Sequence, residues 1–396
     1  MPTQRIQSID LLRALTMLLM IWVNDFWRLT DIPAWLQHMP ADVDALGFSD
    51  VIFPAFLFIV GLAIPFATEA RRRRGEGDRE ILAHIVLRAL ALIVMGFFMV
   101  NLESYSETST RLSKSSWQLL MIVAFVLIWN AYEPERVSAR VQRLLQAVGV
   151  LLLILLAALF SSDPSSNFTL MRPHWWGILG MIGWSYLLCA IAQLFRGQSL
   201  LAMAAIWLFF SLFNIAAFAG WLEPLGFMQP YLWLIGDASM PAMTMAGCVI
   251  ATLYQQRFSG GNDGRRFLLL LLVTGVLLLL AGLALRPAWG ISKILATPAW
   301  TQLCTGISVL CFALFYGLAD LRGYSLWPRL LLPAGVATLT CYLVPYVAYP
   351  LLQRLPVDLP PMLSSGAAGL LTSALFALAV VMLTGGLNRI GIRLKI

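Results

Sequence analysis

The chain has 396 residues, of which 60% are hydrophobic and 12% are charged, and its formal net charge is +7. Soluble globular proteins carry about 25% charged residues, so this composition excludes a water-soluble fold. A helix needs about 20 apolar residues to cross the hydrocarbon core of a bilayer, and apolar runs near that length recur along the whole chain. We therefore predict an all-α fold, a polytopic transmembrane bundle of ten to twelve helices.

Twelve apolar runs follow one another in the sequence. In chain order they are residues 11–26, 51–67, 82–101, 117–132, 144–160, 175–195, 200–219, 240–254, 267–285, 300–319, 330–352 and 366–385. Several are short, which leaves tilted or re-entrant segments open. The longest polar connections, residues 28–49 and 102–116, are too short for a soluble domain. We expect one transmembrane domain over residues 1–396.

The distribution of Lys and Arg predicts the orientation of the bundle. With the N-terminus in the cytoplasm, the inner segments hold 19 of these residues and the outer segments hold 7. Cationic loops are retained in the cytoplasm, so both ends are expected there, in the inner (cytoplasmic) membrane of a cell. The positive charge then reflects topology and contact with anionic lipids, not nucleic-acid binding. The run Arg71–Arg74 is interpreted as a cytoplasmic anchor.

Neither a metal site nor a disulfide framework is indicated. The five cysteines fall within or beside apolar runs without paired spacing. The three histidines are far apart and show no i, i+4 pair, so no metal is expected. His84 and His174 lie near predicted membrane interfaces and are interpreted as structural. Asp10 and Arg13 stand at the start of the first run, which argues that it is a retained helix rather than a cleaved signal.

Polar groups at membrane depth are costly and mark candidate sites. Asp10 and Arg13, three residues apart on a helix, form either a charge-paired helix end or a site for an anionic cosubstrate. At the outer ends of the first two helices stand Asn24, His38 and Asp50. A carboxylate bonded to one ring nitrogen prepares a histidine for proton transfer near neutral pH. The alternative is that His38 is an ordinary surface residue and that the acids are simply solvated.

The N-terminal motifs carry a resemblance to a known family. Residues 5–13 (RIQSIDLLR), 20–24 (MIWVN), His38 and 49–61 (SDVIFPAFLFIVG) resemble the heparan-alpha-glucosaminide N-acetyltransferase family, most closely its bacterial branch associated with amino-sugar use. Weaker similarity continues through Arg172, 177–183, Asp237, 290–293 and Trp300. Two features depart from the family. The His38–Asp50 connection is longer and lacks the family's Trp, Asn and Gly, and the helix pair at about 117–160 looks like an addition to a ten-helix core.

This resemblance implies acetyl transfer from cytoplasmic acetyl-CoA to an amino sugar of the glucosamine type at the opposite face. It implies that His38 is the general base or itself carries the acetyl group, and direct transfer is favoured because it needs no intermediate exposed to water. Asn24 would donate a hydrogen bond to the thioester carbonyl, and Asp50 would orient His38 or recognise the amine. Candidates for binding the CoA cosubstrate would be Arg5, Asp10, Arg13 and Arg88 or Arg266. Lys293, an unusual cation near the outer edge, could face the same cavity and is counted with them.

Two other functions fit the same sequence. An amino-sugar or oligosaccharide transporter shares the helix count, the polar residues and the aromatic interface residues. An O-acyltransferase acting on a glycan hydroxyl is the second. His38 together with Asn24 separates an enzyme from a transporter, since a permease needs no general base. The expected partners are the sugar acceptor, CoA and membrane lipids. A homodimer is left open because no helix-packing motif decides it.

Overall fold

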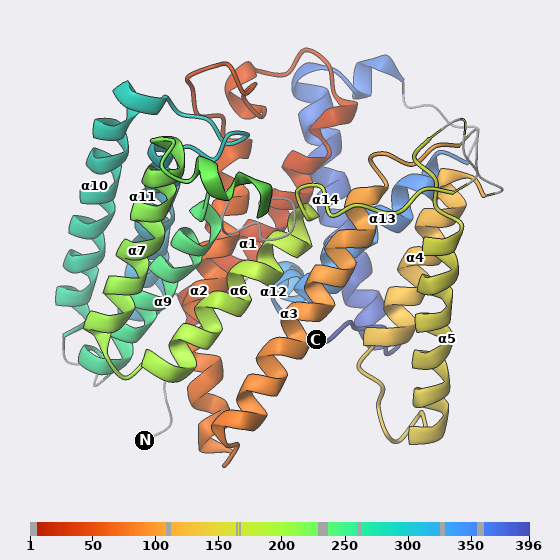
Figure 1. Cartoon of the computed structure of the whole chain (residues 1–396), viewed down its shortest axis with the longest axis horizontal. Helices are drawn as coiled ribbons and strands as arrows, with labels where there is room; N and C mark the ends of the chain where they lie inside the picture. Colours follow the sequence, from red (N-terminus) through yellow and green to blue (C-terminus); the bar gives the residue numbers. More distant parts are fainter. Residues whose placement is uncertain are drawn as a thin grey trace.

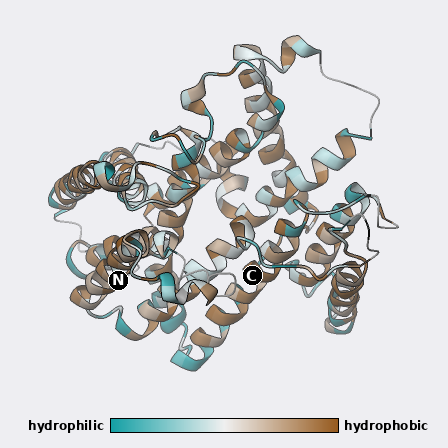
Figure 2. Ribbon diagram, turned by 45° about the horizontal axis from the view of Figure 1, so that its top comes forward, coloured by the Kyte–Doolittle hydropathy of each residue, from teal (hydrophilic) through white to brown (hydrophobic). Residues whose placement is uncertain are grey.

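The computed structural model describes residues 6–107, 112–163, 165, 168–228, 237–259, 263–324, 329–354 and 360–396. These residues form a helical bundle, and they contain two isolated β-bridges but no strand (Figure 1). Figure 2 shows hydrophobic residues along the helices and hydrophilic ones mainly near their ends. The prediction of an all-α bundle is confirmed.

Eleven of the twelve predicted runs each coincide with one helix, and the run at 330–352 contains two. The helices are α1 (Gln7–Asn24), α2 (Ser49–Arg73), α3 (Asp78–Asn101), α4 (Lys114–Trp129), α5 (Ala139–Ala158), α6 (Gly177–Arg196), α7 (Leu200–Phe218), α9 (Ser239–Arg257), α10 (Gly264–Trp289), α11 (Pro298–Phe315), α13 (Thr338–Leu352) and α14 (Gly366–Arg389). Eight of the described helices are long and apolar enough to cross a membrane, and α4 and α13 are shorter apolar helices. The chain is therefore a multi-pass membrane protein.

The predicted run at 330–352 is not one helix, which corrects the sequence interpretation. It divides into a short helix α12 (Leu332–Val336) and α13, and the break is at Ala337, whose φ of −123° and ψ of 52° are not helical. Thr338 donates a hydrogen bond across the break to the carbonyl of Gly335 at 3.3 Å. Non-helical backbone at membrane depth is tolerated where it lines a cavity, and these residues line two cavities described below.

Glycines bring the central helices into backbone contact. A Cβ added to Gly61 of α2 would lie 1.8 Å from the carbonyl oxygen of Thr244 in α9. A Cβ on Gly96 of α3 would lie 2.2 Å from the backbone nitrogen of Gly180 in α6. Small residues allow this close approach between membrane helices. The two crossings bring α2 close to α9 and α3 close to α6, and α2 and α3 carry residues of the candidate site.

The bundle has two ends with different polar content. In Figure 1 the segment 25–48 and the α10–α11 connection lie at the top, and the α2–α3 turn lies at the bottom. The helices α4 and α5 lie at one edge of the bundle and α10 lies at the other.

At the start of α1, Asp320 accepts hydrogen bonds from the backbone nitrogens of Gln7 and Ser8, at 2.8 and 3.1 Å. This contact satisfies two donors that a helix N-terminus leaves unpaired.

Candidate active site

His38 and Asp50 form a direct pair where α2 begins. Nδ1 of His38 lies 2.7 Å from Oδ1 of Asp50. The other carboxylate oxygen accepts hydrogen bonds from the backbone nitrogens of Met39 and Gly47, both at 3.1 Å. Asp50 stands in the first turn of α2, where the helix dipole favours a negative charge, and it is 1% exposed. Asp50 is thus buried behind the imidazole, in a position to orient His38.

The Asp50 contact decides which ring nitrogen of His38 is available. An ionised carboxylate only accepts hydrogen bonds, so Nδ1 carries the hydrogen and Nε2 keeps its lone pair. The His38 side chain is 42% exposed. It lines a cavity of about 130 Å³ together with Asn24, Trp175 and Lys293. The two groups that the sequence predicts for the site, the base His38 and the amide donor Asn24, therefore line the same cavity.

Lys293 places a cationic group beside His38. Its Nζ lies 3.0 Å from Nδ1 and 3.4 Å from Nε2 of His38. Burial lowers the pKa of Lys293, and the nearby Asp50 carboxylate opposes that shift. An ammonium here is in reach of negative charge that develops on a substrate in the cavity. The sequence interpretation placed Lys293 near the outer edge and counted it with Arg13 among the residues for the cosubstrate. In the structure Lys293 lies beside His38, and Arg13 lines another cavity.

An ion pair between the loop after His38 and the last turn of α10 lies next to the segment that bears Lys293. Asp44 accepts hydrogen bonds from Nε of Arg286 at 2.9 Å and from the backbone nitrogen of Ile291 at 2.7 Å. The hydrogen bond from Arg286 holds the pKa of Asp44 below its usual value. At Gly290 the φ of +66° turns the chain beside Asp44. The segment bearing Lys293 is thereby fixed against the segment bearing His38. These partners are 242 residues apart, so no local pattern indicates them.

A second cavity, of about 320 Å³, lies toward the α2–α3 turn. It is lined by Arg13 from α1, Arg71 from α2, and His84 and Arg88 from α3. The Arg88 guanidinium lies 5.1 Å from the ring centre of Tyr186. Three guanidinium groups around one cavity favour an anionic ligand such as a phosphate. The predicted pair of Arg13 with Asp10 is present at 3.1 Å, so Asp10 holds an arginine of this cavity.

Other residues that the sequence proposes for the site lie elsewhere. Arg5 lies outside the described residues. Arg266 pairs with Asp263 at 3.1 Å, its side chain is 80% exposed, and it lines none of the cavities described here. Conversely, Arg71 and His84 were interpreted as an anchor and a structural residue, but both line the arginine cavity. No group of three or more His, Cys, Asp or Glu residues in the described parts of the chain is placed to hold a metal ion.

A third cavity adjoins the other two. It has a volume of about 230 Å³ and is lined in part by the broken segment between α12 and α13. It shares Met20 and Ile178 with the His38 cavity, and it shares Arg88 and Tyr186 with the arginine cavity. Adjoining cavities therefore extend from the arginines to His38 through the interior of the bundle.

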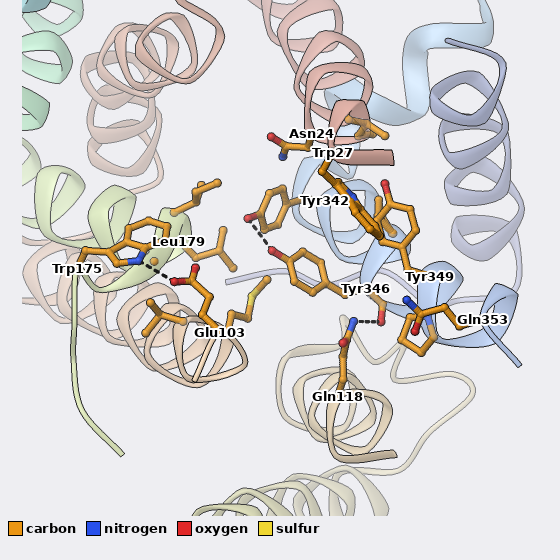
Figure 3. Close-up of a pocket in the computed structure, with 17 residues that line it drawn as sticks. Asn24, Trp27, Glu103, Gln118, Trp175, Leu179, Tyr342, Tyr346, Tyr349 and Gln353 are labelled. Atoms are coloured by element: carbon orange, nitrogen blue, oxygen red, sulfur yellow. Dashed lines mark hydrogen bonds between the residues drawn. The ribbon is translucent and has the colours of Figure 1, made fainter. Parts of the chain in front are cut away.

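A fourth cavity, of about 400 Å³, is drawn in Figure 3 and adjoins the cavity that His38 lines. It shares Asn24, Trp175 and Ile178 with the His38 cavity. In Figure 3 the labelled side chains are mostly aromatic or amide groups, and the carboxylate of Glu103 accepts a hydrogen bond from Trp175. Volumes of about 300–1,000 Å³ are usual for small-molecule sites, so this is the larger candidate binding space at the His38 end.

Comparison with known proteins places this site within a family. A family described as a domain of unknown function, DUF5009, matches residues 5–224. The chain belongs to the DUF5009 family. The DUF5009 match includes His38 and Asp50 and ends before Lys293. Human and mouse heparan-alpha-glucosaminide N-acetyltransferases are each 30% identical over 101 residues, which is 24% of this chain and 14% of either relative. The chain therefore matches only a small part of these relatives, and the resemblance to their family is confirmed over that part.

Proposed function

We propose that the protein is a transmembrane acetyltransferase that transfers the acetyl group of acetyl-CoA to the amine of a glucosamine-type sugar. The observation that carries this proposal is the juxtaposition of a His38–Asp50 pair with cavities that extend to three arginines at the other end of the bundle. The name of the partial relatives supports the same class of reaction. The arginine end would lie in the cytoplasm of a cell with this protein in its inner membrane.

The arginine cavity suits the charged part of CoA. Its nucleotide phosphates are anionic and cannot enter hydrocarbon, so they need cations at an aqueous face. Arg13, Arg71 and Arg88 supply these cations. The pantetheine arm is long, flexible and largely uncharged, and it would occupy the 230 Å³ cavity beside Met20 and Ile178. The thioester would then reach the cavity of His38.

At the His38 end the residues supply a general base and hydrogen-bond donors. Nε2 of His38 takes a proton from the sugar amine as its nitrogen attacks the thioester carbon. Asn24 and Lys293 donate to the carbonyl oxygen as negative charge develops there. When the C–S bond breaks, the imidazolium returns the proton to the departing thiolate. The products are an acetamido sugar and CoA with a free thiol, so atoms and charges balance without an added reactant.

Transport is the second candidate function, because adjoining cavities through a bundle also suit a carrier. The two functions make different demands on His38. A carrier needs no general base, whereas His38 is half-exposed and is held by the buried carboxylate of Asp50. We therefore favour acetyl transfer, and the measurement below separates the two.

The test is acceptor-dependent release of CoA thiol by purified protein in nanodiscs, with acetyl-CoA and glucosamine. We expect release by the wild type and its loss in His38→Ala. The matched control is His174→Ala, because His174 is an exposed histidine that lines none of the four cavities. Loss of activity in both variants, with equal loss of folded protein, would point to a general defect. No release by the wild type, together with saturable uptake of sugar into proteoliposomes, would replace the enzyme with a transporter.

Proteoliposomes also test the sidedness. Acetyl-CoA supplied on one side and a membrane-impermeant aminosugar polymer on the other should yield acetylated polymer. Product formed only when both substrates are on the same side would contradict transfer across the membrane.

A further inference from the structure

The 400 Å³ cavity beside His38 has a composition that points to its ligand. Its aromatic members are two tryptophans and three tyrosines, and its polar members are two glutamines, one asparagine and one glutamate. These residues are Trp27, Trp175, Tyr342, Tyr346, Tyr349, Gln118, Gln353, Asn24 and Glu103. A sugar ring presents C–H groups on its faces and hydroxyls at its edge. Flat amphipathic rings and amide groups match those two parts.

The charge of the residues that line this cavity indicates which class of sugar it would bind. Among the described residues that line the cavity, Glu103 is the charged one, and none of them is Lys, Arg or His. Trp175 donates to Oε2 of Glu103 at 3.1 Å, which fixes the carboxylate at the wall of the cavity. A carboxylate accepts several hydrogen bonds, so this contact leaves acceptor capacity for a ligand. Such a wall favours an ammonium group and disfavours a sulfated or phosphorylated sugar. A lipid chain would leave the polar groups unpaired.

The polar wall is built from helices far apart in the sequence. Gln118 of α4 donates to the carbonyl of Tyr346 in α13 at 2.8 Å. The hydroxyls of Tyr342 and Tyr346 lie 3.4 Å apart. These contacts, drawn in Figure 3, hold a row of polar groups along one side of the cavity. The helix α4 belongs to the pair that the sequence marks as an addition to the ten-helix core, so this pair contributes directly to the binding space.

Size shows how the two cavities divide an acceptor between them. The His38 cavity is about 130 Å³ and the adjoining one is about 400 Å³. The smaller space suits the reacting amine and the acetyl group, and the larger one suits a further sugar unit. Asn24 and Trp175 line both, so one molecule can extend from one into the other.

We propose that this larger cavity is a subsite for a second glucosamine unit, whose ammonium pairs with Glu103, so that the preferred acceptor is a glucosamine oligosaccharide rather than the monosaccharide. The subsite rests on the proposed function for its orientation toward His38. Its binding chemistry does not depend on acetyl transfer. The two can therefore fail separately.

The first experiment measures binding by calorimetry in nanodiscs without acetyl-CoA. The probes are glucosamine, its β-1,4-linked dimer, and the same dimer acetylated on both nitrogens. The charged dimer should bind about tenfold more tightly than the monomer and the acetylated dimer, as expected for one additional charged hydrogen bond. In Glu103→Gln this preference should disappear, while the contact with Trp175 is kept by the amide oxygen. The control is Glu107→Gln, because Glu107 accepts from the backbone of Lys114 and does not line the cavity.

A second pair of variants tests the wall contributed by α4. Gln118→Leu should weaken binding of the charged dimer, and Gln146→Leu should not. Both glutamines donate to a backbone carbonyl, Gln146 to that of Ile128 at 3.1 Å, but only Gln118 lines the cavity. Thermal unfolding of both variants reports whether the fold is kept.

The outcomes separate the two proposals. Dimer binding that depends on Glu103, with no CoA release, keeps the subsite and overturns acetyl transfer. CoA release with glucosamine, together with equal binding of monomer and dimer, overturns the subsite and keeps acetyl transfer. Dimer binding unchanged in Glu103→Gln also overturns the subsite.

Discussion

The two ends of the bundle hold their polar groups in different ways. At the His38 end a buried carboxylate receives three contacts from one loop, at 2.7 to 3.1 Å, and a second ion pair joins that loop to the last turn of α10. At the other end Arg13, Arg71 and Arg88 come from three helices and surround a cavity of about 320 Å³. The first arrangement positions one imidazole, and the second offers charge to a large ligand. A difference of this kind is expected between a site of proton transfer and a site of phosphate binding.

Asp50→Asn should have the largest effect, because it changes which ring nitrogen of His38 carries the hydrogen. The amide can donate to Nδ1 and turn the lone pair away from the cavity. We expect kcat to fall by about 10²–10⁴-fold, the usual contribution of a general base. Steady-state acetyl transfer measures the loss, and Asp42→Asn, at an exposed acid of the same loop, is the control. Near wild-type kcat in a folded Asp50→Asn protein would remove Asp50 from the mechanism.

Arg88→Gln should change KM for acetyl-CoA, whereas Asp50→Asn should change kcat. Loss of one charged hydrogen bond to a phosphate should raise KM for acetyl-CoA by about tenfold and leave kcat at saturation nearly unchanged. Arg143→Gln is the control, because this exposed arginine of α5 donates to the carbonyl of Ala139 and lines no cavity described here. A fall in kcat with constant KM would show that the two ends are not divided as proposed.

The Asp44–Arg286 pair should have a smaller, shared effect on kcat. Both residues act on Lys293 only through the position of its loop, so Asp44→Asn and Arg286→Gln should each lower kcat by about threefold, as for one exposed ion pair. The double variant should show no further loss, because the same contact is already broken. Losses that multiply in the double variant would mean that the residues act independently.

The smallest expected effect concerns Asp237, and it is a change in thermal stability rather than in reaction rate. It accepts from the backbone nitrogen and hydroxyl of Ser239 at the start of α9, both at 2.8 Å, and burial raises its pKa to about 6. A folded-state pKa above the unfolded value means that ionisation costs stability as pH rises through about 4 to 6. Asp237→Asn keeps an acceptor but cannot ionise. Its Tm should exceed the wild-type Tm by a few °C more at pH 7 than at pH 4.5.

Thermal scans of both proteins at the two pH values check this expectation. An equal Tm difference at both would show that Asp237 is ionised alike in the folded and unfolded chains.

Much of the fold could be predicted because the membrane imposes a simple rule. A span must be a helix and must be apolar, so runs such as 51–67 and 267–285 identify α2 and α10 without tertiary information. The same rule missed the break at Ala337. An apolar run carries no mark of where its backbone leaves the helical region, and neighbouring cavities decide whether that is tolerated.

Some residues of the candidate site could be predicted from the sequence, and others could not. His38 and Asp50 are twelve residues apart, so one loop and one helix start are enough to suggest their pairing. Lys293 was recognised as an unusual cation near the outer edge, but its contact with His38 could not be predicted, because the two residues are 255 positions apart. Glu103 and Gln118 were not singled out, because a glutamate in a polar connection and a glutamine in the first turns of an apolar helix resemble any solvated residues. Only their place around a shared cavity distinguishes them.

The order of amino acids was enough to establish that this protein is a helical membrane bundle and that its N-terminal quarter carries a histidine with a carboxylate partner. Hydrophobic length and short-range pairing are local properties of the chain, so they can be recognised without its neighbours in space. Three-dimensional packing was needed to find which cations meet His38, which arginines share a cavity, and how adjoining cavities connect the two ends. These depend on contacts between α1, α2, α3, α6 and α13, where packing geometry rather than local composition selects the neighbours.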